Sequence, residues 1–305
     1  MAALEPRIRA QANALIDAFI TQGTTDIVSH FANPLPQAVF SVELAGMDPV
    51  DMPYLLKVVS LAGPMEARAV NFGLGLAKIE EYLRQRRDRA PRGDIVAALL
   101  AFEHAGYHWM DKVGTLSQLT IGGIGTPGCA FSGGLHYLAT HPAERQRLIA
   151  DLGQLPNAIE EFLRLFMGAP NMVRRATPDV ELGGPQMAAG DRGLLSFGAA
   201  SRDPAICERP HEIDLTRPSS RHLAFGAGNH RCIGASLARL ILRVGYEQFL
   251  TRVADDFVPV YETGNTRHMV ELPVTFAPGS SRLAMILRPF LVPIAIEIGD
   301  RDGFA

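Results

Sequence analysis

Apolar residues recur at helical spacing through the first two-thirds of the chain. Within residues 4–19 they stand three or four positions apart, which is the period of one helix face and predicts an amphipathic helix. Residues 111–140 are apolar on most sides and predict a long, buried central helix. Pro142 comes next, and because proline suits the first turn of a helix, a new helix is expected to begin there. Similar patterns predict helices at residues 53–61, 68–89, 94–102 and 156–167.

After about residue 170 the segments become short and interrupted. Residues 179–182 and 193–197 flank glycine-containing turns, which predicts short strands. Residues 201–220 are rich in Pro, Arg and Asp with little periodicity, so we expect an ordered meander. A glycine-rich loop at 225–234 leads into a helix predicted over 235–251. Strand-like segments follow at 270–276 and 283–287.

No repeat, low-complexity segment or linker divides the sequence, so we expect a single domain over residues 1–305. Its helical part covers about residues 1–170, and its strands, meander and loop cover about 171–305. The expected fold class is mainly α with small β-sheets. Roughly 75% of the unfolded surface can be buried at this length, so the core needs neither a disulfide nor a metal.

Composition narrows the range of partners. The charge balance of 29 Lys and Arg against 32 Asp and Glu gives −3, which argues against nucleic acid or an anionic membrane as the main partner. Three scattered cysteines are too few for a secreted disulfide framework. Residues 1–10 lack the apolar core of a signal peptide, and Pro293 interrupts the most apolar stretch. A cytoplasmic protein is therefore expected.

The loop at residues 225–234 carries the strongest chemical signal. Cys232 stands just before a helix, where free N–H groups and the positive end of the helix dipole stabilise a thiolate. Glycines let the backbone fold tightly around a sulfur and leave room for a flat partner. Phe225 can shield that sulfur from water, and His230 can hydrogen-bond an anion beside a metal plane.

Two other interpretations of the loop stay open from the residues alone. Cys232 can be a buried structural cysteine in a tight loop, with His230 satisfied nearby. A zinc site is the second alternative, but His230 and Cys232 supply only two ligands, and the sequence has no second CxxC or HxxxH pair.

This loop closely resembles the haem-binding signature of the cytochrome P-450 family, the haem-thiolate monooxygenases. The resemblance implies haem b as cofactor, with Cys232 as the axial thiolate ligand of iron and His230 on a propionate. The other positions of the signature that it assigns to cofactor binding are Phe225, Gly226, Gly228 and Gly234.

Glu161 and Arg164 match the family's Glu-x-x-Arg pair. Residues at i and i+3 share a helix face, so the two side chains can form a charge-assisted pair. We interpret this pair as structural. The family's propionate-binding arginine corresponds to Arg174; an exposed arginine at a strand start is the alternative. Relatives commonly carry Arg-Phe where this chain has Glu212 and Ile213, which places the third member of the Glu-x-x-Arg network in doubt.

The central helix contains three glycines and Pro127, which should weaken it unless a local role requires them. Pro127 removes an N–H and frees the carbonyl of Gly123, so a widened groove is expected beside the Thr126 hydroxyl. By resemblance, Thr126 is the threonine of an acid–threonine pair that steers protons to dioxygen, with Gly125 at the acid position. A proline-kinked packing helix is the alternative.

The segment around Thr126 looks most like that of bacterial, soluble camphor-hydroxylase-type members, which are longer by roughly a hundred residues; the part lacking here is expected at the N-terminus. The resemblance implies a monooxygenase that hydroxylates a small hydrophobic molecule with dioxygen and electrons from a ferredoxin-type donor. The alternative is a degenerate haem-binding or interaction protein derived from that fold.

Overall fold

The computed structural model describes residues 1–47, 65–217, 221–253, 257–259, 263–265 and 268–279. The helix expected at 53–61 and the strand expected at 283–287 lie outside this part. The main described helices are α1 (Glu5–Asp17), α2 (Pro34–Ala38), α4 (Met65–Arg87), α5 (Ile95–Ala101), α6 (Trp109–Thr140), α7 (Pro142–Ala150), α8 (Leu155–Leu165), α9 (Phe197–Ala200) and α10 (Ala235–Arg252). Shorter helical turns lie at Ala2–Leu4, Val28–Ala32, Val39–Leu44, Leu152–Gln154 and Gly228–His230.

Local chemistry explains where several helices begin. The Asp94 side chain accepts a hydrogen bond from the N–H of Ala97 at 2.9 Å and caps α5. At the start of α6, Asp111 accepts the N–H of His108 at 2.7 Å, the return arm of a capping box. α7 begins at Pro142, as the sequence predicts. These contacts join residues three apart or fewer, so sequence patterns predicted the helix starts well.

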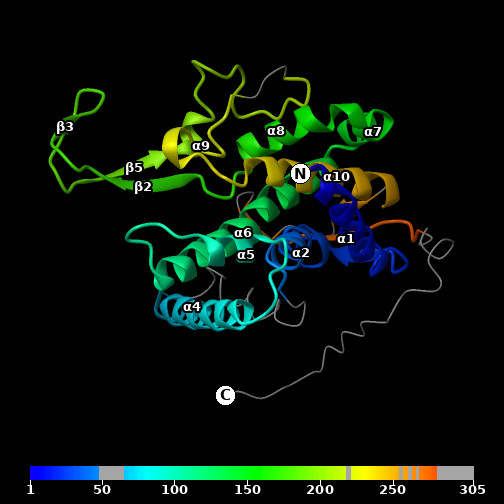
Figure 1. The fold of residues 1–305 in the computed structure, drawn as a ribbon. Helices are drawn as coiled ribbons and strands as arrows, with labels where there is room; N and C mark the ends of the chain where they lie inside the picture. The colour runs from blue at the N-terminus through cyan, green and yellow to red at the C-terminus, as the bar shows by residue number, and fades with distance from the viewer. Residues whose placement is uncertain (48–64, 218–220, 254–256, 260–262, 266–267, 280–305) are drawn as a thin grey trace.

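The core is built around α6, which runs through the middle of the molecule with α8 and α10 on one side and α4 on the other (Figure 1). The ring of Tyr246 in α10 stacks on Phe131 of α6 with centroids 4.5 Å apart. Its hydroxyl donates to the carbonyl of Ala130 at 2.8 Å. A Cβ at Gly134 would lie 2.0 Å from that hydroxyl, so this crossing of α6 and α10 requires glycine.

The small sheets are antiparallel. The largest has the order β1-β9-β6, formed by Thr24–Asp26, Pro273–Thr275 and Val258–Pro259. β2 (Asn171–Arg175) pairs with β5 (Arg192–Ser196), with Val173 opposite Leu194. The remaining pairs are β3 (Val180–Glu181) with β4 (Gln186–Met187), and β7 (Thr263–Asn265) with β8 (His268–Glu271). The β2–β5 ribbon projects from the helical body in Figure 1 and carries the β3–β4 hairpin at its tip.

The structure confirms the expected fold class, mainly α with small β-sheets. Strand β2 was not predicted, because its five residues are all exposed and show no alternation of buried and exposed positions. Within the described residues, no helix is both long enough and apolar enough to cross a membrane.

Candidate functional site

The glycine-rich loop is a closed turn placed directly before α10. Gly226 and Gly228 have φ of 63° and 66°, the left-handed region that favours glycine. The N–H of Cys232 donates to the carbonyl of Phe225 at 2.8 Å, which brings the two ends of the turn together. The cysteine side chain is exposed and stands next to the first turn of α10. The fold therefore presents this thiol outward at a helix N-terminus.

The surroundings of Cys232 suit a flat, largely apolar group. Ile233, the next residue, is 89% exposed, which is unusual for a large apolar side chain. Nothing lies within 4 Å of the Cβ position at Gly228, so that side of the loop is open. His230 is exposed in the short turn Gly228–His230. A soft sulfur donor, an open face and an adjacent apolar side chain fit haem iron with a thiolate ligand.

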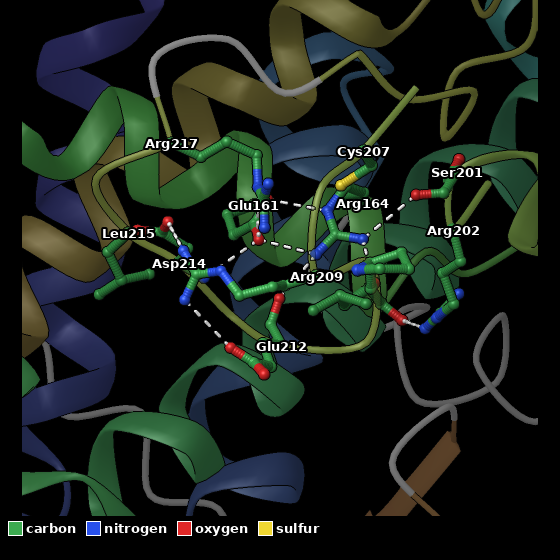
Figure 2. Close-up of polar contacts among 12 residues, drawn as sticks. Glu161, Arg164, Ser201, Arg202, Cys207, Arg209, Glu212, Asp214, Leu215 and Arg217 are labelled. Carbon is green, nitrogen blue, oxygen red and sulfur yellow. Dashed lines mark hydrogen bonds and ion pairs between the residues drawn. The ribbon is translucent and has the colours of Figure 1, made fainter. Parts of the chain in front are cut away.

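Glu161 and Arg164 form a fully buried ion pair in α8 (Figure 2). The Nε of Arg164 donates to Oε2 of Glu161 at 2.8 Å, and Nη2 donates to Oε1 at 2.7 Å. Three further N–H groups of Arg164 reach meander carbonyls, those of Ser201 at 3.2 Å, Pro210 at 2.6 Å and Glu212 at 2.9 Å. All five guanidinium donors are thus satisfied.

This pair holds the meander onto α8. Oε1 of Glu161 accepts the N–H of Asp214 at 3.1 Å, in addition to its bonds from Arg164. Burial by itself raises the pKa of Glu161, but the hydrogen bonds from Arg164 and Asp214 outweigh burial and hold that pKa below its ordinary value. The carboxylate stays charged, and Figure 2 shows its contacts with Arg164 of α8 and with the meander residues Asp214 and Arg217.

The doubt about a third member of this network is resolved by Arg217. Its Nε lies 3.3 Å from Oε1 of Glu161, and Nη1 donates to the carbonyl of Glu208 at 2.8 Å. Glu212, where relatives carry arginine, contributes its backbone carbonyl, while its carboxylate pairs with Arg209 at 3.1 Å. The second arginine of the network is thus Arg217, five residues after Glu212, and local spacing does not reveal this placement.

In α6, Thr126 and Gly125 lie on an open stretch of helix. The hydroxyl of Thr126 donates to the carbonyl of Gly122 at 2.6 Å, one turn back. A helical threonine readily bonds to the carbonyl of the fourth residue before it, and this bond fixes the orientation of the Thr126 hydroxyl. Cβ positions at Gly122 and Gly125 meet nothing within 4 Å. The helix continues through Pro127 without interruption.

Arg174 lies in β2, exposed, and its Nη1 donates to the carbonyl of neighbouring Val173 at 3.0 Å. Successive residues of a strand point to opposite faces, so Met172 and its partner Leu195 share the face of Arg174. Their side chains are 44% and 39% exposed, and the Arg174 guanidinium therefore lies on an exposed, partly apolar face of the ribbon.

A second charged network, missed from the sequence, connects α8 to the loop. Glu160 accepts Nε and Nη2 of Arg239 in α10 at 2.6 and 2.8 Å. It also contacts Nε2 of His222 at 2.9 Å. His222 and Arg239 stand 62 and 79 positions after Glu160 in the sequence, so no local pattern indicates that the three residues meet. Arg239 and His222 also both lie against Phe225, with the Arg239 Cζ 4.5 Å and the His222 ring centroid 6.0 Å from the Phe225 ring centroid.

The zinc alternative finds no third ligand in the described part of the chain, where no group of three or more His, Cys, Asp or Glu side chains could hold a metal ion. The donor set around the loop is a single exposed thiol at a helix N-terminus. That set suits an axial ligand to a metal whose other positions come from a macrocycle.

Comparison with known proteins extends the argument to most of the chain. The cytochrome P-450 family profile matches residues 49–257. A steroid C26-monooxygenase of Mycolicibacterium smegmatis is 32% identical over 289 residues, covering 89% of this chain and 72% of that protein. Pentalenic acid synthase of Streptomyces avermitilis is 30% identical over 295 residues, covering 90% and 71%. The crystal structure of CYP105P1 in complex with filipin I matches with a TM-score of 0.85 and 29% identity, covering 92% and 74%.

Both the sequence relatives and the fold agree with the chemistry of the loop. The family match covers more than half of the chain, and the relatives are matched over more than two-thirds of their length. The cofactor that follows is haem iron held by a thiolate, and such enzymes receive electrons from a redox partner. The chain belongs to the cytochrome P-450 family of haem-thiolate monooxygenases.

Proposed function

We propose that Cys232 is the thiolate ligand of a haem b iron, and that the enzyme hydroxylates a small hydrophobic molecule. The observation that carries this proposal is the exposed Cys232 thiol at the N-terminus of α10, inside a turn closed by its own N–H on the Phe225 carbonyl. When bound, haem supplies dioxygen activation and oxygen-atom transfer. The residues of the chain bind it, orient it and manage water and protons.

Each site residue then has a defined task. Cys232 donates sulfur, and the N-terminal dipole of α10 favours the charged thiolate. Phe225, half-buried against the core, shields that sulfur from water. His230 and Arg174, both exposed, bind the propionates, while Gly226, Gly228 and Gly234 allow close approach of the ring.

Protons reach the oxygen site through Thr126. Its hydroxyl is within hydrogen-bond distance of the Gly122 carbonyl, and no carboxylate stands at Gly125. Thr126 and water therefore carry the relay alone. A positioned acid or base contributes typically 10²–10⁴-fold to a proton transfer, so we expect electrons to be wasted when dioxygen is the oxidant.

The substrate class and the electron donor follow from two supports. A steroid, named for the mycobacterial relative, is a hydrophobic small molecule, and the exposed apolar Met172 and Leu195 on the face of Arg174 suit such a ligand. The donor is a ferredoxin-type protein, small and acidic, for which the exposed Arg221 and Arg231 around the loop offer a complementary surface. Reduction by such a donor should slow as ionic strength rises.

The test of the iron ligand is the absorption spectrum of the haem-loaded, reduced chain under carbon monoxide. Wild-type protein should show the strongly red-shifted Soret band of thiolate ligation, and Cys232→Ser should lose it. Cys207→Ser is the matched control, because Cys207 is buried in the meander and its Sγ contacts the carbonyl of Glu208. An unchanged band in Cys232→Ser removes the assignment.

A haem-binding protein without efficient turnover is the second candidate, favoured by the glycine at position 125. Hydrogen peroxide carries both protons and both electrons, so it separates the two candidates. Product formed with peroxide but little with dioxygen indicates a monooxygenase limited by proton supply. No product with either oxidant, in protein that shows the thiolate band, favours the binding protein.

A further inference from the structure

The Glu160 carboxylate is the centre of a network that reaches the back of the thiolate loop. Arg239 holds it with two parallel hydrogen bonds of 2.6 and 2.8 Å, the strong bidentate geometry. Nδ1 of His222 accepts the N–H of Ala224 at 3.1 Å, which leaves the ring proton on Nε2 to donate to Glu160 at 2.9 Å. One carboxylate therefore connects α8, the segment before the loop and α10.

The network is charged and partly shielded from solvent. The His222 side chain is 3% exposed, that of Glu160 is 26% exposed and that of Arg239 is 36% exposed. Burial alone raises the pKa of Glu160, but the hydrogen bonds from Arg239 and His222 lower it to about 2. Glu160 and Arg239 thus form a neutral pair made of two full charges.

Phe225 is held from both its ring and its backbone. Cζ of Arg239 lies 4.5 Å from the ring centroid, which is cation–π geometry. The His222 ring centroid is 6.0 Å from the Phe225 centroid. The carbonyl of Phe225 accepts the N–H of Cys232 at 2.8 Å. A displacement of the Arg239 guanidinium would therefore move Phe225, whose carbonyl closes the turn around Cys232.

The charge of Arg239 also acts on the sulfur directly. The hydrogen bonds to Glu160 are the main reason that the pKa of Arg239 is raised, and a charged Cys232 thiolate raises it further. A positive charge near a thiolate stabilises the more negative, reduced state of a metal centre. The reduction potential therefore depends on how far the Glu160 carboxylate compensates the charge of Arg239.

We propose that Glu160 is a positioning residue for the thiolate: it fixes Arg239 on the Phe225 ring and balances the charge that Arg239 places behind the Cys232 sulfur. The inference deepens the proposed function and rests on Cys232 being the iron ligand. Glu160 is assigned no contact with the reacting groups: it acts through its contacts with Arg239 and His222 and through their packing on Phe225. Its consequence is a reduction potential set by the balance of one carboxylate and one guanidinium.

The experiment compares charge variants of the haem-loaded protein by the reduction potential of the bound haem, measured by spectroelectrochemistry. Glu160→Gln leaves Arg239 uncompensated and should raise the potential. Arg239→Gln leaves the carboxylate uncompensated and should lower it. The double variant restores neutrality and should lie close to the wild type, as should Glu160→Asp, which keeps the charge.

Glu247→Gln is the matched control, and it lies on α10, the helix that also carries Arg239. Glu247 in α10 accepts Nη1 of Arg9 at 2.6 Å, so the substitution removes one charge from a comparable ion pair away from Phe225. Its potential should equal that of the wild type. Thermal unfolding of every variant, measured in parallel, shows whether a lost haem signal comes from lost fold. If Glu160→Gln is unstable, Arg239→Gln still tests the proposal, because its potential should fall below that of the wild type.

The inference is overturned if the reduction potentials of Glu160→Gln and Arg239→Gln shift with the same sign. It is also overturned if neither shifts by more than that of Glu247→Gln, and the network is then merely structural. The reduced carbon monoxide spectrum separates this failure from failure of the proposed function. A wild-type protein with the thiolate band but unmoved potentials contradicts only the role of Glu160. A wild-type protein that binds haem without that band contradicts the ligand assignment, and the role of Glu160 falls with it.

Discussion

Removing the Glu161 carboxylate should destabilise the protein more than almost any other single change in its polar groups. In the native state, two of the five N–H donors of Arg164 bind this carboxylate, and three bind meander carbonyls. Glu161→Ala leaves a guanidinium whose side chain has 0% exposure without its counter-charge and with two unmet donors. Arg217 loses its carboxylate partner in the same step.

The expected cost follows from these contacts. Breaking a buried pair by removing one partner costs about 3–5 kcal/mol, because the remaining charge stays buried and uncompensated. For a chain of this size 1 kcal/mol shifts the melting temperature by roughly 1.5–2 °C, so a fall of about 5–10 °C is expected. Total stabilities are about 5–15 kcal/mol, so the variant should also retain little haem.

The assay is thermal unfolding followed by circular dichroism, with haem content measured from the Soret band. Glu144→Ala is the control, since Glu144 and Arg147 have the same i, i+3 spacing in α7 but are each 33% exposed. That pair should contribute no more than about 0.5 kcal/mol. A Glu161→Ala protein that melts with the wild type, holds full haem and loses only turnover would refute the structural interpretation.

Three further outcomes are expected. Gly125→Asp has room for its side chain and should raise product formed per electron consumed with dioxygen, while the peroxide-driven rate changes less; efficient coupling in the wild type would contradict this. Gly134→Ala should lower the free energy of unfolding by about 1–3 kcal/mol, because its Cβ would meet Tyr246. Gly122→Ala, whose Cβ meets nothing, should be neutral or stabilising. Equal melting temperatures of these two variants would contradict the packing argument. Because the folded-state pKa of Glu160 is lowered to about 2, its stabilisation is present above its ordinary unfolded pKa and is lost as pH falls toward 2. Glu160→Gln should therefore show a shallower loss of stability on acidification, and parallel pH curves for variant and wild type would contradict it.

The sequence by itself determined the helices and the chemistry of the loop. The starts of α5 and α7, at Asp94 and Pro142, depend on residues within one turn, and the structure has them where the pattern predicts. The central helix begins at Trp109, two residues before the predicted Asp111. The loop from Phe225 to Cys232 is also local, because its glycines and the cysteine before a helix act within ten residues. Spacing alone placed Glu161 and Arg164 on one helix face.

Only the tertiary structure decided which distant groups meet. Arg217 reaches Glu161 across 56 positions, and Arg239 reaches Glu160 across 79. Glu160 and Glu161 are neighbours in sequence, yet one holds the thiolate loop and the other holds the meander, because successive residues of a helix point about 100° apart. Local propensity extends over about one turn, so it cannot tell which segment packs against each face; burial of the α6, α8 and α10 side chains in one core makes that choice.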